Sequence, residues 1–294
     1  MIQTLKLELQ APAKVNLGLK ILRRRPNGYH ELDSRMLPIS LEDTLWVELG
    51  GQGIRVHCPG HENLDGPANL AGRAAAAWLE ASPCQKGLGI VIKKRIPQAA
   101  GLGGGSSNAA SLLLALNRLL PPLPEASLAR LALQLGADVP FFLQAGPCRA
   151  QGLGEILTAL PHLPSVWFIL ACAPFGLSTR DVFNGLNLRL TSDGGNVSYN
   201  RPRMGFRELV TDLRNDLQPV AEAMQPSIGD VCKNLVKAGA HGATMSGSGP
   251  SVVGLFPTRN EARQAIRRLL RDEGWTYQVV KGITSVLASR IQAT

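Results

Sequence analysis

A glycine-rich segment between a predicted strand and a predicted helix carries the clearest chemical signal in this sequence. It reads Pro97-Gln98-Ala99-Ala100-Gly101-Leu102-Gly103-Gly104-Gly105-Ser106-Ser107-Asn108. Glycine lets backbone amides approach an anion closely, and the N-terminal end of the following helix adds free N–H groups and positive dipole charge. An ordinary turn needs only one or two glycines, and this segment has more. The segment therefore predicts a phosphate-binding loop.

Two common phosphate loops do not fit this segment. A Walker loop needs a lysine at the helix start, and no lysine follows Gly105. The dinucleotide fingerprint needs a glycine where Ser106 stands. It also needs an acidic residue about 20 positions further on, and Leu120-Pro121-Pro122-Leu123 stands there instead. The loop therefore belongs to another class.

Hydrophobic periodicity predicts the elements that must position this loop. Helical spacing predicts a helix from Ala109 that ends before Pro121-Pro122. Alternating apolar residues predict half-buried strands at Leu5–Leu9, Val15–Ile21 and Leu88–Ile92. Further helices are expected over 69–80, 125–135, 220–238 and 260–272, further strands over 166–171, 251–256 and 275–280, and a mobile surface loop over 190–202.

The length and composition are those of a globular protein. With 294 residues, two packed domains are the natural expectation, although a single large α/β domain stays possible. The proline-rich stretch Leu160–Pro164 marks the expected boundary. Hydrophobic residues make up 45% and charged residues 18%, which argues against disorder.

The net charge of +9 allows either a nucleic-acid surface or a site for small polyanions, and charge alone does not choose. The basic runs Arg23–Arg25 and Lys93–Arg95 are short, so each is interpreted as a solvated face. Five widely spaced cysteines indicate a reducing compartment and no structural metal. The N-terminus has no secretory pattern and no apolar stretch is long enough to span a bilayer, so we expect a soluble cytoplasmic protein.

Three segments together resemble the GHMP kinase family. They are Ala11-Pro12-Ala13-Lys14-Val15-Asn16-Leu17-Gly18-Leu19, the glycine-rich loop, and Met245-Ser246-Gly247-Ser248-Gly249-Pro250-Ser251. The chain departs from the family pattern at Ala99 and Ala100, where glycine is frequent, and at Pro250, where alanine is usual. The resemblance implies an α+β fold of two domains, with a mixed α/β N-terminal domain (1–164), a ferredoxin-like C-terminal domain (165–294) and the active site between them.

The resemblance also implies phosphoryl transfer from ATP to an alcohol, with Asp138 as general base and Lys14 as the cation beside it. Taken alone, Asp138 is more simply a turn residue before Val139-Pro140. Magnesium is expected to arrive with ATP, because no carboxylate cage that would identify metal ligands is visible. The implied ATP-binding residues are Asn69, Pro97, Gly101, Leu102, Gly103, Gly104, Gly105, Ser106 and Ser107.

Within the family, Arg25–Leu32 and Leu135–Phe142 are similar to members that phosphorylate a cytidine diphosphate alcohol. This similarity implies substrate contacts at Asn16, Tyr29, His30, Thr179 and Phe183. An aromatic ring can stack on the base, and histidine offers one donor and one acceptor to its edge.

Simpler interpretations of these substrate residues exist, since a lone histidine is usually a surface residue and Phe183 could be a core residue.

The resemblance leads us to expect small-molecule partners, with neither nucleic acid nor membrane, and we leave the oligomeric state open. The alternatives are another GHMP kinase, of mevalonate or homoserine type, and, more distantly, a basic nucleic-acid-binding protein.

Overall fold

Two long strands form the frame of the molecule. The structure is a computed structural model and describes residues 5–84, 86–144, 146–160, 163–186, 204–269, 274–283 and 291–293. β1 (Leu5–Arg24) and β2 (His30–Leu49) pair in antiparallel register along almost their whole length. The sequence predicted two separate strands in β1. They are continuous because Pro12 lies at a register shift, where a proline is tolerated.

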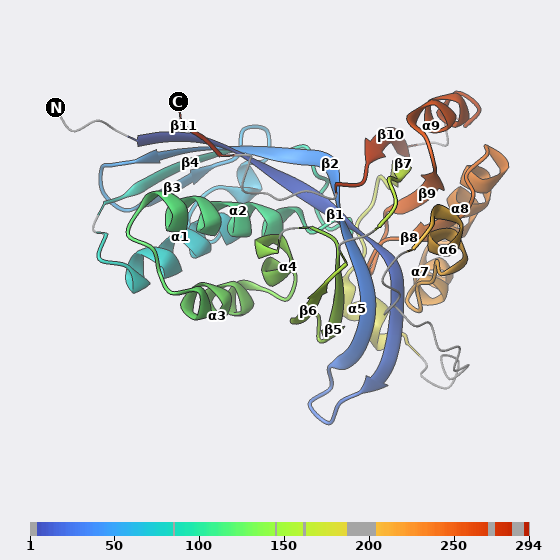
Figure 1. Cartoon of the computed structure of the whole chain (residues 1–294), viewed down its shortest axis with the longest axis horizontal. Helices are drawn as coiled ribbons and strands as arrows, with labels where there is room; N and C mark the ends of the chain where they lie inside the picture. The colour runs from blue at the N-terminus through green and yellow to red at the C-terminus, as the bar shows by residue number, and fades with distance from the viewer. Residues whose placement is uncertain are drawn as a thin grey trace.

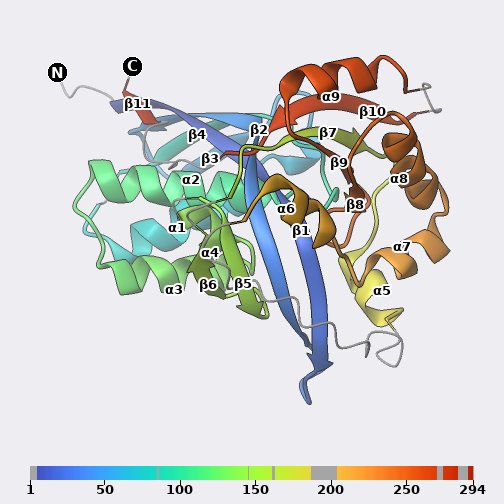
Figure 2. The same cartoon turned by 45° about the vertical axis from the view of Figure 1, so that its right-hand side comes forward.

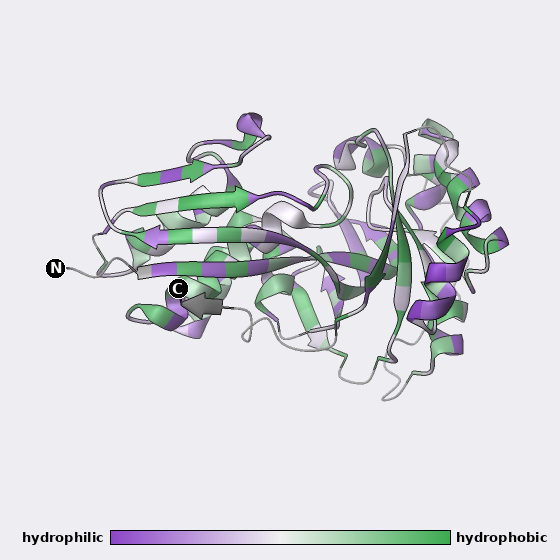
Figure 3. Ribbon diagram, turned by 90° about the horizontal axis from the view of Figure 1, so that it is seen from above, coloured by the Kyte–Doolittle hydropathy of each residue, from purple (hydrophilic) through white to green (hydrophobic). Residues whose placement is uncertain are grey.

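The first sheet is built around this strand pair and is covered by helices on one face. Its main strand order is β11-β1-β2-β4-β3, and β5 pairs with both β2 and β6. Figure 1 shows the helices beneath the sheet, and Figure 3 shows the other face, where hydropathy alternates along the strands. The remaining elements are β3 (Ile54–His57), β4 (Leu88–Lys93), β5 (Cys148–Gly152), β6 (Ile156–Ala159), β11 (Ile291–Ala293), α1 (Leu70–Ala81), α2 (Gly104–Leu119), α3 (Glu125–Leu135) and α4 (Val139–Leu143), with a 3-10 turn at Glu62–Leu64.

The second sheet has four antiparallel strands in the order β10-β7-β9-β8. Numbered within this unit, the order is 4-1-3-2, with helices between its first and second and its third and fourth strands. This is the ferredoxin-like arrangement that was predicted. Figures 1 and 2 show α7, α8 and α9 grouped away from α1 to α3. The elements are β7 (Trp167–Cys172), α5 (Thr179–Asn184), α6 (Phe206–Thr211), α7 (Gln218–Met224), α8 (Ser227–Lys237), β8 (Ala243–Met245), β9 (Val252–Phe256), α9 (Arg259–Ile266) and β10 (Thr276–Lys281).

A single strand, β1, contributes side chains to three hydrophobic clusters. Leu7 and Leu9 pack in the cluster under α1 and α2, whereas Val15 packs against β7 and β9. Leu19 and Ile21 join the cluster that contains α8 and α9. The apolar side chains of β1 therefore reach the cores of both halves of the molecule, and from Ala11 to Leu19 the residues between them are buried as well.

Three predicted helices differ from the observed ones. The helix expected from Ala109 begins at Gly104, because the glycine-rich loop itself forms the first turn. The helix expected over 220–238 is divided into α7 and α8 by Gln225-Pro226, because proline cannot continue a helix from the preceding turn. The helix expected over 260–272 ends at Ile266. The loop expected over 190–202 lies outside the described residues. None of the described helices is both long and apolar enough to cross a membrane.

The domain boundary near residue 164 stays a prediction. The chain passes there from β6 into β7, which is the first strand of the second sheet. The last strand, β11, returns to the first sheet and pairs with Leu7–Leu9.

Candidate active site

A cleft of about 650 Å³ lies where β1, β2, the glycine-rich loop, α5 and the turn between β8 and β9 approach one another. Its wall includes most of the residues that the sequence singled out. Tyr29, His30 and Ser107 are not part of this wall. The predicted residues that line the cleft are Lys14, Asn16, Asn69, Pro97, Gly101, Leu102, Gly103, Gly104, Gly105, Ser106, Asp138, Thr179 and Phe183.

The glycine-rich loop enters α2 through a helix start that has no side-chain cap. Gly103 is the N-cap residue, with a left-handed φ of 70°, and offers no side chain to the first amides of the helix. A Cβ at Gly103 would lie 3.0 Å from Phe142, and one at Gly104 would lie 2.9 Å from Ile96. Because Gly103 to Ser106 line the cleft, the positive end of α2 is available there to an anion.

The turn between β8 and β9 packs directly on this loop. Gly101 has a φ of +72°, and a Cβ there would lie only 2.3 Å from the carbonyl oxygen of Ser246. Ser246 Oγ donates a hydrogen bond to the carbonyl of Gly101 (3.2 Å) and accepts one from the backbone N–H of Asn16 (3.2 Å). The three segments that resemble GHMP motifs therefore meet at Ser246. At the departure from the family pattern, Ala99 adopts a φ of 49°, which glycine would adopt more easily.

Lys14 and Asp138 come together on the cleft wall. Lys14 Nζ lies 3.7 Å from Asp138 Oδ2 and donates a hydrogen bond to Asn16 Oδ1 (2.7 Å). Lys14 is buried, whereas the side chain of Asp138 is 41% exposed. Asn16 is itself held by a bond from its Nδ2 to Ser34 Oγ (2.8 Å). The ammonium group is thus fixed by neighbours, and the carboxylate remains accessible from the cleft.

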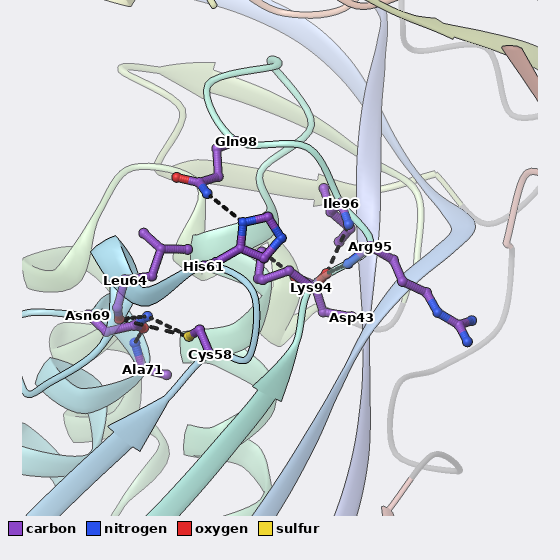
Figure 4. Close-up of polar contacts among 10 residues, drawn as sticks. All are labelled: Asp43, Cys58, His61, Leu64, Asn69, Ala71, Lys94, Arg95, Ile96 and Gln98. Atoms are coloured by element: carbon purple, nitrogen blue, oxygen red, sulfur yellow. Dashed lines mark hydrogen bonds and ion pairs between the residues drawn. The ribbon is translucent and has the colours of Figure 1, made fainter. Parts of the chain in front are cut away.

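Asn69 caps α1 and lines the cleft, and Figure 4 shows its contacts. Its Oδ1 accepts the backbone N–H of Ala71 (2.9 Å), and its Nδ2 donates to the carbonyl of Leu64 (2.9 Å). The same Nδ2 lies 3.6 Å from Cys58 Sγ. These contacts occupy both ends of the side-chain amide, so its contact with adenine stays a prediction.

His30 and Tyr29 lie at the far end of the β1–β2 hairpin. The rings of His30 and Phe183 have centroids 5.3 Å apart and are tilted by 33°. Burial, and secondarily the charge of Arg24, lower the pKa of His30, which favours the neutral imidazole. Tyr29 is 63% exposed. Thr179, on the same helix as Phe183, has its Oγ1 2.8 Å from Ser248 Oγ. The roles of these residues in substrate binding stay predictions.

Several cleft residues were not foreseen from the sequence. Ser34, Lys94 and Ser248 line the cleft, together with the apolar side chains of Leu19, Leu32 and Met36. The interpretation of Lys93–Arg95 as a solvated face is wrong for Lys94, whose side chain is only 6% exposed. Its partner Asp43, on β2, is fully buried. No local pattern marks this pair, because its two members are far apart in the chain and meet only after folding.

The described residues contain no group of three or more histidine, cysteine, aspartate or glutamate side chains suited to hold a metal ion. Asn108 nevertheless lines the cleft, is almost fully buried, and has an Oδ1 without a hydrogen-bond partner among the described residues. A neutral oxygen of this kind suits Mg²⁺ or a donor group of a ligand.

Comparison with known proteins assigns the family. The model of the GHMP kinases N terminal domain matches residues 69–146, and that of the GHMP kinases C terminal matches residues 202–274. A 4-diphosphocytidyl-2-C-methyl-D-erythritol kinase of Syntrophus aciditrophicus is 42% identical over 94% of this chain and 99% of its own. This chain belongs to that kinase family. A relative from Geobacter sulfurreducens with the same name is 44% identical over 95% of this chain and 99% of its own.

Solved structures agree with this kinase family and with its wider fold. A crystal structure of 4-(cytidine 5'-diphospho)-2C-methyl-D-erythritol kinase superposes with a TM-score of 0.77 at 37% identity, covering 94% of this chain and 99% of the other. A homoserine kinase from Cytophaga hutchinsonii reaches a TM-score of 0.73 at 19% identity, covering 100% of this chain and 98% of its own. At that identity the likeness shows the fold alone. The two-domain GHMP kinase fold predicted from the sequence is therefore confirmed.

Proposed function

We propose that the protein transfers the γ-phosphoryl group of ATP to the 2-hydroxyl of 4-diphosphocytidyl-2-C-methyl-D-erythritol, a step of the non-mevalonate route to isoprenoid precursors. Near-complete coverage at 42% identity supports the reaction. The single structural observation that carries it is the convergence of the glycine-rich loop with Lys14 and Asp138 in one cleft. Phosphoryl transfer requires the donor and the alcohol to be held together, so the loop that would bind the phosphates must lie beside the groups that would act on the alcohol.

The glycine-rich loop is the proposed seat of the triphosphate. Its backbone amides at the start of α2 offer hydrogen bonds and a partial positive charge to the phosphate oxygens. Family membership implies ATP as the nucleotide. Magnesium bound to the phosphates would neutralise charge that develops during transfer, and Asn108, whose Oδ1 has no partner among the described residues, is a candidate to contact it.

Asp138 is the proposed acceptor of the hydroxyl proton. It lies at the N-cap position of α4 but makes no capping bond to that helix. Its carboxylate is therefore free to face the alcohol, while the charge of Lys14, 3.7 Å away, would stabilise the nascent alkoxide. Asn16 and Ser34 keep the ammonium in place.

The end of the cleft near Phe183 is the proposed seat of the cytidyl group. The neutral ring of His30, next to Phe183, offers one donor and one acceptor to a cytosine edge. Thr179, one turn before Phe183 on α5, and its neighbour Ser248 add hydroxyl groups to this end of the cleft. Tyr29 lies at the exposed hairpin tip, where it would reach the base only from outside this wall.

The test is a three-substrate assay. The purified protein is incubated with MgATP and either the cytidyl alcohol, mevalonate or homoserine, and ADP release is followed. We expect turnover with the cytidyl alcohol alone, and phosphorus NMR of the product should show a new phosphomonoester. Turnover with mevalonate or homoserine instead would transfer the proposal to another GHMP activity.

A further inference from the structure

The carboxylate of Asp43 is fully buried behind the part of the cleft that is proposed to bind ATP. Asp43 lies on β2 immediately before Thr44, which pairs with Lys93 at the end of β4. Its Oδ1 accepts the backbone N–H groups of Arg95 (2.7 Å) and Ile96 (2.9 Å). Its Oδ2 accepts a short hydrogen bond from Lys94 Nζ. One side chain therefore holds three consecutive residues at the point where the chain leaves the sheet (Figure 4).

Stability alone is a weak reason for this arrangement. Removing a carboxylate and an ammonium group from water is costly, and a buried ion pair can often be replaced by apolar residues without loss of stability. Asp43 has no exposed surface and the side chain of Lys94 has 6%. A pair of this kind calls for a role in addition to packing.

The three residues that Asp43 holds lead directly to the phosphate loop. Lys94 lines the cleft, and its Nζ lies 3.2 Å from the position that a Cβ on Gly104 would take. The side chain of Ile96 lies 2.9 Å from the same position. Gly104 is the first residue of α2, so the side chains of Lys94 and Ile96 both pack against the first turn of this helix, whose amides face the cleft. A displacement of residues 94–96 would therefore move the anion-binding end of α2.

We propose that Asp43 is a positioning residue for the nucleotide, an inference that rests on the function proposed above. Through its carboxylate it holds the Lys94 ammonium beside the first turn of α2, where that charge adds to the attraction for the triphosphate. Through Arg95 and Ile96 it sets the backbone path into the loop. Asp43 itself touches no substrate and acts only through its neighbours.

Three variants separate this role from a packing role. Asp43→Asn keeps the size and an oxygen for the two amides but removes the negative partner of Lys94. Lys94→Met removes the ammonium and keeps the apolar stem, and the double variant leaves no unpaired buried charge. Lys93→Met is the matched control, because it removes the same charge from an exposed neighbour. The readouts are the Kd for MgATP by calorimetry without the alcohol, kcat, the KM for the alcohol and the midpoint of urea unfolding.

We expect the Kd for MgATP to rise about tenfold or more in both single variants, as for the loss of a charge-assisted bond. The KM for the alcohol should stay within about twofold and Lys93→Met should resemble the wild type. The double variant should unfold at a urea concentration close to that of the wild type and still bind MgATP weakly.

Wild-type nucleotide affinity in either folded single variant, or in the double variant, would overturn the proposal. If a single variant fails to fold, the double variant decides. The Kd is measured without the alcohol, so the result stands apart from the assay of the proposed function. If the wild-type protein binds MgATP but phosphorylates none of the three alcohols, the proposed function is wrong. The role of Asp43 is then still decided by the Kd for MgATP of the variants.

Discussion

The carboxylate of Asp138 differs from that of an ordinary capping aspartate because it accepts no hydrogen bond from the helix that follows it. It precedes α4 without accepting a backbone N–H of that helix, and it faces a buried lysine at 3.7 Å. An aspartate that served only the turn would use its oxygens to satisfy the helix amides. The geometry thus favours the chemical role of Asp138 over the turn role that its local sequence suggests.

The first prediction concerns Asp138→Asn. The substitution is nearly isosteric and removes the proton acceptor, so kcat should fall about 10⁴-fold or more, at or beyond the upper end of what general-base assistance supplies. The Kd for MgATP and the urea midpoint should change little. Turnover, nucleotide affinity and unfolding are measured on one preparation. Near-normal turnover per folded molecule would remove Asp138 from the mechanism.

The second prediction concerns the pH dependence of substrate binding. Burial, followed by the charge of Arg24, lowers the pKa of His30 in the folded protein. Affinity for the cytidyl alcohol should be constant above the ordinary histidine pKa of 6.5 and fall as pH drops through the lowered value. The contribution of His30 to folding stability should follow the same direction, because the unfolded chain binds the proton more readily.

Arg24→Gln offers a control for this prediction, since it should raise the pKa of His30 and move the loss of affinity to higher pH. The pKa is measured by NMR titration of the imidazole, assigned with His30→Gln, and affinity by calorimetry. MgATP affinity should not follow the same curve. A pKa of His30 at or above 6.5 would contradict the electrostatic account.

Residues that belong to contiguous motifs could be located from the sequence, and residues that act through distant contacts could not. Lys14 and Asp138 stand in recognisable segments and line the cleft as expected. Asp43 and Ser34 stand in no such segment. Their importance arises from bonds to Lys94 and Asn16, on other strands and loops, and a single sequence does not display these pairings.

At the scale of elements, the glycine-rich loop and the turn between β8 and β9 behave as one unit. The third prediction is that Gly101→Ala should lower the free energy of unfolding by about 1–3 kcal/mol, because it combines a positive φ with a collision against the backbone at Ser246. It should also weaken MgATP binding, since the loop must move. Urea unfolding and calorimetry give both quantities.

Gly105→Ala is the matched control for stability. Gly105 lies within α2, and the nearest atom to its new Cβ would be Leu70 Cδ2 at 4.0 Å. Its free energy of unfolding should therefore stay level or rise by roughly 0.5–1 kcal/mol. Equal losses in the two variants would show that glycine content, and not the contact with Ser246, matters.

The strand at Leu88–Ile92 and the end of the helix before Pro121 were located because their periodicity is strong and these ends are marked. The start of that helix was not, and β2, β3, β5, β6 and β8 were not predicted at all. Proline or a register shift accounts for two further errors. The expected single helix over 220–238 ignored Pro226, which divides it. β1 continues through Pro12 because it pairs with β2 on both sides of that residue. Local propensity cannot predict this pairing.

At the scale of the whole molecule, the sharing of β1 among three hydrophobic clusters binds the two sheets into one cooperative structure. The fourth prediction is that urea unfolds both halves in a single transition, because neither core can lose β1 and persist. Trp78 reports on the first cluster and Trp275 on the third. Fluorescence of variants that retain only one of these tryptophans should give the same midpoint and slope.

A difference of more than about 0.5 M between the two midpoints, equivalent to roughly 0.5–1.5 kcal/mol at slopes of about 1–3 kcal/mol/M, would indicate separate unfolding of the halves. Phenylalanine replaces the other tryptophans in each variant. Calorimetry provides an independent check, since a two-state protein has equal calorimetric and van't Hoff enthalpies.

The pairing of β11 with β1 joins two segments that are far apart in the chain. Ile291–Ala293 follow Leu7–Leu9 by more than 280 residues, so the ribosome makes them much later. Until they are made, the edge of β1 at Leu7–Leu9 stays open, and an open strand edge invites pairing with other chains. Folding during synthesis therefore leaves this edge unprotected until β11 emerges.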